Sequence, residues 1–137
     1  MLRGGVLKIY DYNFPVNVHG CDPSLSTKQY ITISGALSYV NPFTSLKYHL
    51  IAHQAIRMPD LDHHLLCSMK CRADGVVINK CPRMYCGEPT QCSHAIVAMD
   101  ENSASFVLPF FLRGVTSHLT VMPLTRDEFE HHGCTRI

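Results

Sequence analysis

YITISGALSYV-NPFTS-LKYHLIAHQAI, residues 30–56, is the clearest strand signal in this 137-residue chain. Its two halves are rich in β-branched and aromatic residues, and an Asn-Pro turn signal separates them. From Leu46 to Leu50, and on to Ala52-His53, the even positions are apolar, while Lys47, His49 and His53 face the other way, as a half-buried strand requires. The stretch therefore predicts an antiparallel hairpin of Tyr30–Val40 and Leu46–Ile56, joined by a five-residue loop.

Short strand-like runs separated by frequent turn signals fill most of the remaining chain. Further strands are predicted at Val6–Tyr12, Val16–His19, Val76–Asn79, Ala95–Met99, Phe106–Leu112 and Val115–Val121. Turns are predicted between them, including one at Asn13-Phe14-Pro15. The expected fold class is mainly β, in a single domain that covers residues 1–137.

Helix is expected in two short places only. Leu65, Leu66 and Met69 would share one face of a helix within Asp62–Arg72. Thr125 followed three residues later by Glu128 is a capping-box start, which predicts one or two helical turns within Thr125–His132.

The composition argues against a nucleic-acid or membrane partner. Twelve Lys and Arg residues balance 11 Asp and Glu residues, so no basic surface for phosphates is expected. The longest apolar run, Phe106–Leu112, is far shorter than the ~20 residues that span a bilayer. No signal-peptide pattern follows Met1, which favours a cytoplasmic location.

Seven cysteines and nine histidines are unusual numbers for a chain of this length. Five of the cysteines fall between Cys67 and Cys92, and the candidate zinc ligands are Cys67, Cys71, Cys81, Cys86, Cys92 and His94. Two pairs have the loose spacing of a structural zinc site, but neither carries the glycine-bearing turn of a zinc ribbon. Reduced thiols in the core and loops are the favoured interpretation, so no metal or other cofactor is expected and zinc stays the alternative.

The segment QAIRMPDLDHHLLCSM, residues 54–69, resembles the protease-like region of copia-type LTR retrotransposon Gag-Pol polyproteins. The family pattern has the form apolar-x-x-Pro-x-Leu-x-x-Asn-Leu-Leu-Ser. Pro59, Leu61, Leu65 and Leu66 fill it, whereas His64 and Cys67 stand where the family often has Asn and Ser. Looser similarity covers Val16–Ser24, Lys70–Val76, Ser93–Val97 and Gly114–Leu119, so the resemblance extends over about residues 5 to 131.

The resemblance implies a small closed β domain of the retropepsin type, which pairs with a second copy to build its active site. Tyr30–Ile56 would supply a flap or its supporting strands, and Phe110–Gly114 would supply a strand near the end of the domain. The motif predicts that Ile56, Leu61, Leu65 and Leu66 are buried together, so that Leu65→Ala would cost about 2–5 kcal/mol.

The catalytic motif of that family is missing from the sequence. Aspartic proteases use two carboxylates that share one proton, each carried on an Asp-Ser/Thr-Gly turn. No Asp of this chain has Gly two residues on, and Ile33-Ser34-Gly35 has no Asp before its Ser. We therefore expect no catalytic residue, with Asp11, Asp22 and Asp74 as exposed, dispensable turn carboxylates, and we expect the chain to represent a fragment that begins after the catalytic segment.

Three alternatives remain open on sequence alone. The chain could be a small β domain without any activity, a zinc-stabilised binding module, or a dimerising or peptide-binding β module. A homodimer is the candidate partner, and the sequence predicts no substrate-binding residue.

Overall fold

The computed structural model describes residues 5–19, 27–59, 62–99, 103–131 and 135–136. Strand accounts for 51% of these residues, in three small sheets, and helix is confined to short segments. The mainly β prediction is therefore confirmed. No closed barrel is found among the described residues.

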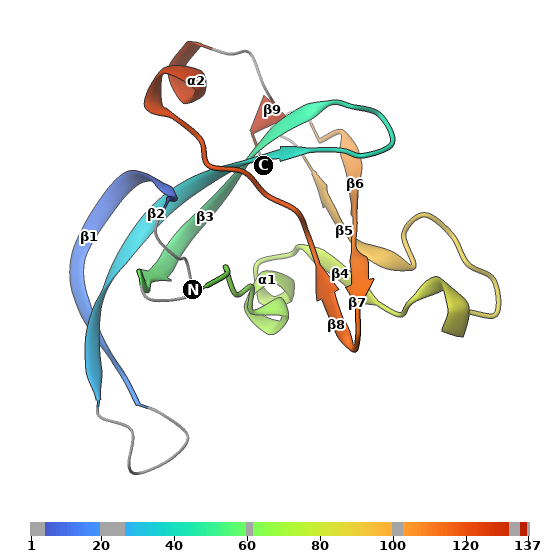
Figure 1. Ribbon diagram of the computed structural model, residues 1–137, viewed down its shortest axis with the longest axis horizontal. Coiled ribbons are helices and arrows are strands. Elements are labelled where there is room, and N and C mark those ends of the chain that lie inside the picture. The colour runs from blue at the N-terminus through green and yellow to red at the C-terminus, as the bar shows by residue number, and fades with distance from the viewer. Residues whose placement is uncertain (1–4, 20–26, 60–61, 100–102, 132–134, 137) are drawn as a thin grey trace. The chain divides into compact units, whose positions relative to one another are not determined.

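The largest sheet has the strand order β1-β2-β3-β9, and Figure 1 shows β1, β2 and β3 side by side. Its members are β1 (Leu7–Val18), β2 (Lys28–Val40), β3 (Lys47–Arg57) and β9 (Thr135–Arg136). The predicted hairpin is confirmed as β2 and β3. Asn41 closes its loop, because its backbone N–H donates to the Leu46 carbonyl at 2.9 Å and its side-chain oxygen accepts from the backbone of Phe43 and Thr44.

The predicted turn at Asn13–Pro15 is wrong. β1 continues through it as one antiparallel strand, with Asp11 opposite Ile33 and Pro15 opposite Ile31. Three residues of β1 thus face one residue of β2, and Asn13 takes a positive φ of 50°. Pairing on both sides holds the chain extended, and a bulge accommodates a proline that cannot donate to the ladder.

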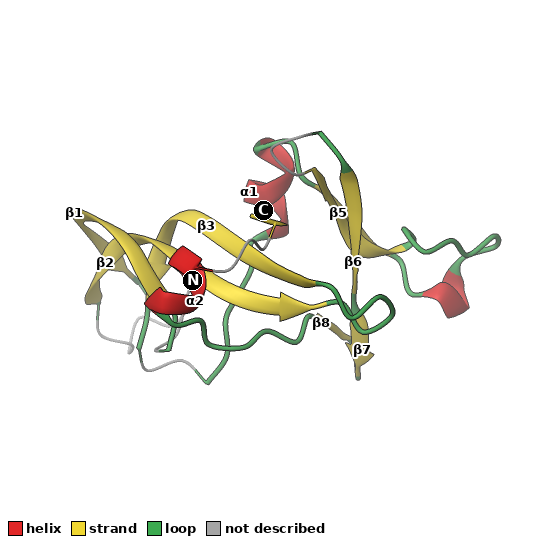
Figure 2. Ribbon diagram, turned by 90° about the horizontal axis from the view of Figure 1, so that it is seen from above, coloured by secondary structure: helices red, strands yellow, loops and turns green. Residues whose placement is uncertain are grey.

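A second sheet has the order β4-β5-β6, and Figure 2 shows β5 and β6 side by side. These strands are β4 (Val77–Lys80), β5 (His94–Met99) and β6 (Ser105–Pro109), all antiparallel. A 3₁₀ turn, η1 (Arg83–Tyr85), lies in the connection between β4 and β5.

The predicted strand Phe106–Leu112 is divided in the structure. β6 ends at Pro109, and Phe111–Arg113 forms β7, which pairs with β8 (Thr116–His118) in a separate sheet. Proline lacks the N–H that would continue the ladder, and the Phe110 N–H donates to the His94 carbonyl instead. β8 is also shorter than the predicted Val115–Val121.

The helix at residues 62–72 forms only in its C-terminal half, as α1 (Ser68–Ala73). Gly75 ends it with a φ of +86°, and the N–H groups of Gly75 and Val76 donate to the carbonyls of Arg72 and Cys71. This double bond pattern is the Schellman helix ending, whose left-handed position favours glycine.

The second helix is α2 (Arg126–His131), and its predicted capping box is confirmed. The Glu128 N–H donates to Thr125 Oγ1 at 3.3 Å, and Glu128 Oε2 accepts from the Thr125 backbone N–H at 3.1 Å. The side chain of Arg126 in α2 also donates to the Lys8 carbonyl of β1 at 3.1 Å.

The chain forms two compact units, and strands β2 and β3 contribute residues to both. Unit 1 comprises residues 1–37, 50–65 and 123–132, and unit 2 comprises residues 38–49, 66–122 and 133–137. The buried apolar residues of unit 1 are Ile33, Ala36, Leu37 and Leu124. Those of unit 2 are Tyr39, Tyr48, Ile78, Ala95, Ile96, Ala98 and Leu108. The prediction of a single domain stays a prediction.

Candidate functional site

The motif at residues 54–69 does not form the buried cluster that was predicted. Leu65 and Leu66 are 43% and 56% exposed, Pro59 is exposed, and Ile56 is half-buried at the end of β3. Leu61 lies outside the described residues. The leucines are exposed because the segment between residues 62 and 67 forms neither strand nor helix. The buried apolar side chains of unit 1 belong to other residues.

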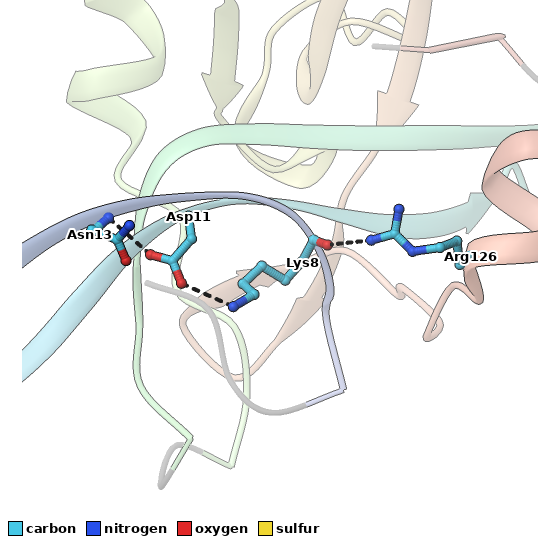
Figure 3. A network of polar contacts seen from close by, with 4 residues as sticks. All are labelled: Lys8, Asp11, Asn13 and Arg126. Atoms are coloured by element: carbon cyan, nitrogen blue, oxygen red, sulfur yellow. Dashed lines mark hydrogen bonds and ion pairs between the residues drawn. The ribbon is translucent and has the colours of Figure 1, made fainter.

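Asp11 was expected to be a dispensable carboxylate in a turn. The expected turn position is wrong. Asp11 lies within β1 at the bulge, where Oδ2 accepts from Lys8 Nζ at 2.9 Å and Oδ1 accepts from the Asn13 N–H at 3.0 Å (Figure 3). Figure 3 also shows Arg126 on the Lys8 carbonyl. The Asn13 N–H, followed by the Lys8 ammonium, lowers the pKa of Asp11 below its ordinary value, because both groups favour the charged carboxylate.

Asp74 matches its expectation more closely. It is exposed at the C-terminal end of α1, and its carboxylate pairs with Lys70 one helical turn earlier, at 2.6 Å. Asp22 lies outside the described residues. Asp11 and Asp74 each form an ion pair with a lysine.

The six candidate zinc ligands do not meet at one point, although Cys81 lies near Cys86 and Cys67 near Cys71. In the described ranges no group of three or more His, Cys, Asp or Glu side chains could hold a metal ion. Cys67 and Cys81 are exposed free thiols, and Cys71, Cys86 and Cys92 are half-buried ones. The structure thus places these five thiols in loops and on α1, outside the buried core.

Two of the thiols have shifted acidities. The pKa of Cys81 is raised, first because its side chain shares a hydrogen bond with Cys86 across the 3₁₀ turn. The pKa of Cys71 is raised mainly by burial, with the neighbouring Cys67 and Asp74 adding to the effect. Both shifts favour the neutral thiol, which is the weaker nucleophile and metal ligand.

His94, the sixth candidate ligand, makes its contacts within unit 2. Its Nε2 lies 2.8 Å from Ser117 Oγ, and its ring packs against Phe110 with ring centres 5.4 Å apart. Burial lowers the pKa of His94, so the neutral imidazole is favoured. The arrangement is that of a hydrogen-bonded core histidine.

A chain of hydrogen bonds in unit 1 was not foreseen from the sequence. Tyr12 Oη lies 2.9 Å from Ser34 Oγ, and Ser34 Oγ lies 3.0 Å from His53 Nδ1, so that three neighbouring strands are tied together. Ser34 is only 2% exposed, so a substrate has no access to its hydroxyl. This series of hydrogen bonds is therefore structural. The sequence holds no signal for it, since side chains on separate strands meet only once the register is set.

The buried His49 is a correction to the predicted strand pattern. Its side chain is fully buried, although it was assigned to the polar face of the strand with Lys47 and His53. Tyr48, its neighbour on the opposite face, is also buried. β3 is therefore covered on both faces at this end, and alternation of residue types cannot reveal such double coverage.

An aromatic-walled pocket of about 450 Å³ lies in unit 2 and was also not predicted. Its wall contains the stacked pair Tyr48 and Phe106, whose ring centres are 5.3 Å apart at an interplanar angle of 19°. Asn41 anchors the β2–β3 loop beside it, because Asn41 Nδ2 donates to the Val107 carbonyl of β6 at 3.2 Å. The full lining is Asn41, Phe43, Thr44, Tyr48, Arg83, Gln91, Ser105, Phe106, Val107 and Pro109.

In the part of the chain that the structure describes, no helix combines the length and apolar character that crossing a membrane requires. No protein-family model, no curated protein and no solved structure matches the chain.

Proposed function

We propose that this chain is a fragment of the retropepsin-like region of a copia-type retrotransposon polyprotein, without proteolytic activity on its own. The observation that carries the proposal is the motif at residues 54–69, in which Pro59, Leu61, Leu65 and Leu66 fill the family pattern. The mainly β content and the β2–β3 hairpin that leads into this motif support it. The short α2 helix after the apolar residues 110–112 is also in keeping with the end of such a domain.

The absence of activity follows from the missing carboxylate turn. A retropepsin needs one Asp-Ser/Thr-Gly from each of two copies, so that two carboxyls share a proton. The 137 residues contain no such triplet.

The proposal includes a second copy of the chain as partner and a cytoplasmic location, as for the polyprotein it resembles. The exposed carboxyl-terminal part of the motif, Leu65 and Leu66, is apolar surface that a second copy could cover. Sedimentation over a hundredfold range of concentration tests this part, and a strict monomer throughout would remove it.

A peptidase assay with an add-back arm tests the main proposal. The isolated chain should cut no peptide substrate between about pH 4 and 7, the range suited to one shared proton. A fusion that supplies an amino-terminal Asp-Ser/Thr-Gly segment from a copia-type element should gain pepstatin-sensitive cleavage. Asp→Asn in the supplied triplet is the matched control and should abolish it.

Two results would overturn the proposal. Cleavage by the isolated chain that is lost in Asp11→Asn or Asp74→Asn would reveal an unrecognised catalytic pair. A folded fusion that stays inactive with its triplet intact would remove the resemblance as a guide to function.

A further inference from the structure

The pocket of unit 2 combines aromatic and polar lining residues. The Tyr48 and Phe106 rings are stacked on each other in its wall, and Phe43, which is 72% exposed, also lines it. A flat aromatic ring that packs against the exposed aromatic side chains of the lining gains a contact worth more than the buried area alone. The volume of about 450 Å³ falls in the range typical of small-molecule sites.

The polar groups of the pocket decide the charge of the ligand. Among the lining residues that the structure describes, Arg83 alone carries a charge and none carries a carboxylate. The side chains of Arg83, Gln91 and Ser105 have no hydrogen bond or ion pair to any other residue in the described ranges. A guanidinium presents a planar fork of donors that matches a carboxylate.

The two loops that hold these groups are braced from within unit 2. Arg83 lies in the 3₁₀ turn, which is closed by the Tyr85 N–H donating to the Pro82 carbonyl at 2.9 Å. Phe43 and Thr44 lie in the β2–β3 loop, where Asn41 Oδ1 accepts from both backbone N–H groups. The pocket is thus formed before any ligand arrives, which lowers the entropy cost of binding.

We propose that this pocket binds small aromatic carboxylates, with the ligand ring against the aromatic side chains of the lining and the carboxylate on Arg83. Gln91 and Ser105 supply further hydrogen-bond donors in the lining. This site is independent of the proposed polyprotein origin, because it uses none of the residues of the motif at 54–69.

Three probes that share one ring system test the proposal: 2-naphthoate, the neutral 2-naphthamide, and 2-naphthylmethylammonium. In titrations of the ¹⁵N-labelled full chain, naphthoate should shift the amide signals of Asn41, Phe43, Thr44 and Val107, and it should leave those of Asp11–Phe14 in unit 1 unchanged. Calorimetry should rank affinity as naphthoate, then naphthamide, then the ammonium compound.

Two variants with matched controls assign the roles. Arg83→Gln should weaken naphthoate about fivefold, the upper range for an exposed ion pair, and should leave naphthamide unchanged. Phe43→Ala should weaken both ligands about two- to tenfold. Arg113→Gln, an exposed arginine on β7, and Phe14→Ala, which removes a ring that is 66% exposed on β1, should bind like the unaltered chain.

The proposal fails if millimolar naphthoate shifts no pocket amide. It also fails if Arg83→Gln, shown to be folded by its amide spectrum, binds naphthoate as the unaltered chain does. An equal loss in Arg113→Gln would show that general surface charge, and not this pocket, attracts the anion.

Discussion

Leu65 belongs to the motif that carries the family resemblance, yet its side chain is 43% exposed. Truncating an exposed leucine removes little buried area, so Leu65→Ala should lower the free energy of unfolding by less than about 1 kcal/mol. Leu108→Ala is the matched comparison, because Leu108 is 2% exposed in β6 and should cost about 2–5 kcal/mol. Urea unfolding of both variants checks this, and an equal loss for the two would contradict the exposure of Leu65.

Tyr39 carries a buried hydroxyl in the core of unit 2. The residue is 1% exposed, and its hydroxyl has no hydrogen-bond partner among the described residues. A buried polar group without a partner loses its hydration without compensation, so Tyr39→Phe should raise the free energy of unfolding at pH 7 by about 1 kcal/mol. A loss of 1 kcal/mol or more on denaturant unfolding would show that the hydroxyl is bonded.

The same tyrosine gives the protein a pH dependence at the alkaline end. Burial, with a smaller contribution from Tyr48, raises the pKa of Tyr39 to about 12. An unfolded tyrosine ionises near pH 10, so between pH 10 and 12 the unfolded chain has lost a proton that the folded chain keeps. Ionisation of this group therefore does not change the free energy of unfolding below pH 10 and lowers it as the pH rises to 12, by about 3 kcal/mol at most. The gap between the unaltered chain and Tyr39→Phe should widen over that interval, and a constant gap would be the contrary result.

At the scale of elements, the ending of α1 depends on one glycine. Gly75 has a φ of +86°, and a Cβ built there meets no atom within 4 Å, so a substitution would be opposed by backbone conformation and not by space. Gly75→Ala should therefore cost about 1 kcal/mol. Gly87 is equally open and has no left-handed φ, so Gly87→Ala should be neutral or slightly stabilising. Thermal unfolding of the two variants checks the contrast, which would vanish if α1 ended in another way.

At the scale of the whole molecule, strands β2 and β3 contribute residues to both compact units. Loss of either unit removes residues from these strands, so the chain should unfold in one cooperative transition. The C2–H signals of His53 in unit 1 and His94 in unit 2, followed by NMR in urea, should give the same midpoint. Two separate midpoints would show that the units unfold independently and would contradict the single-domain prediction.

Local signals in the sequence predicted part of the secondary structure correctly. The period-2 pattern, the Asn-Pro turn and the Thr125–Glu128 capping box each act within a few residues, and the hairpin and α2 formed where they predicted. Two of the errors lie at prolines, while the helix predicted at residues 62–72 and the strand predicted at residues 115–121 were too long. Pro15 is absorbed in a bulge of β1, and Pro109 separates β6 from β7. A proline removes one N–H in either case, and only the partner strand decides which outcome follows.

Burial and the sites were decided by tertiary structure alone. His49 is buried and Leu65 is exposed, although their residue types favour the reverse, because coverage depends on which segments lie over a strand. The aromatic pocket brings together residues from the β2–β3 loop, η1 and β6, which are far apart in the sequence. Contacts of that kind arise only when the strands are in register, so no local pattern of residues encodes them.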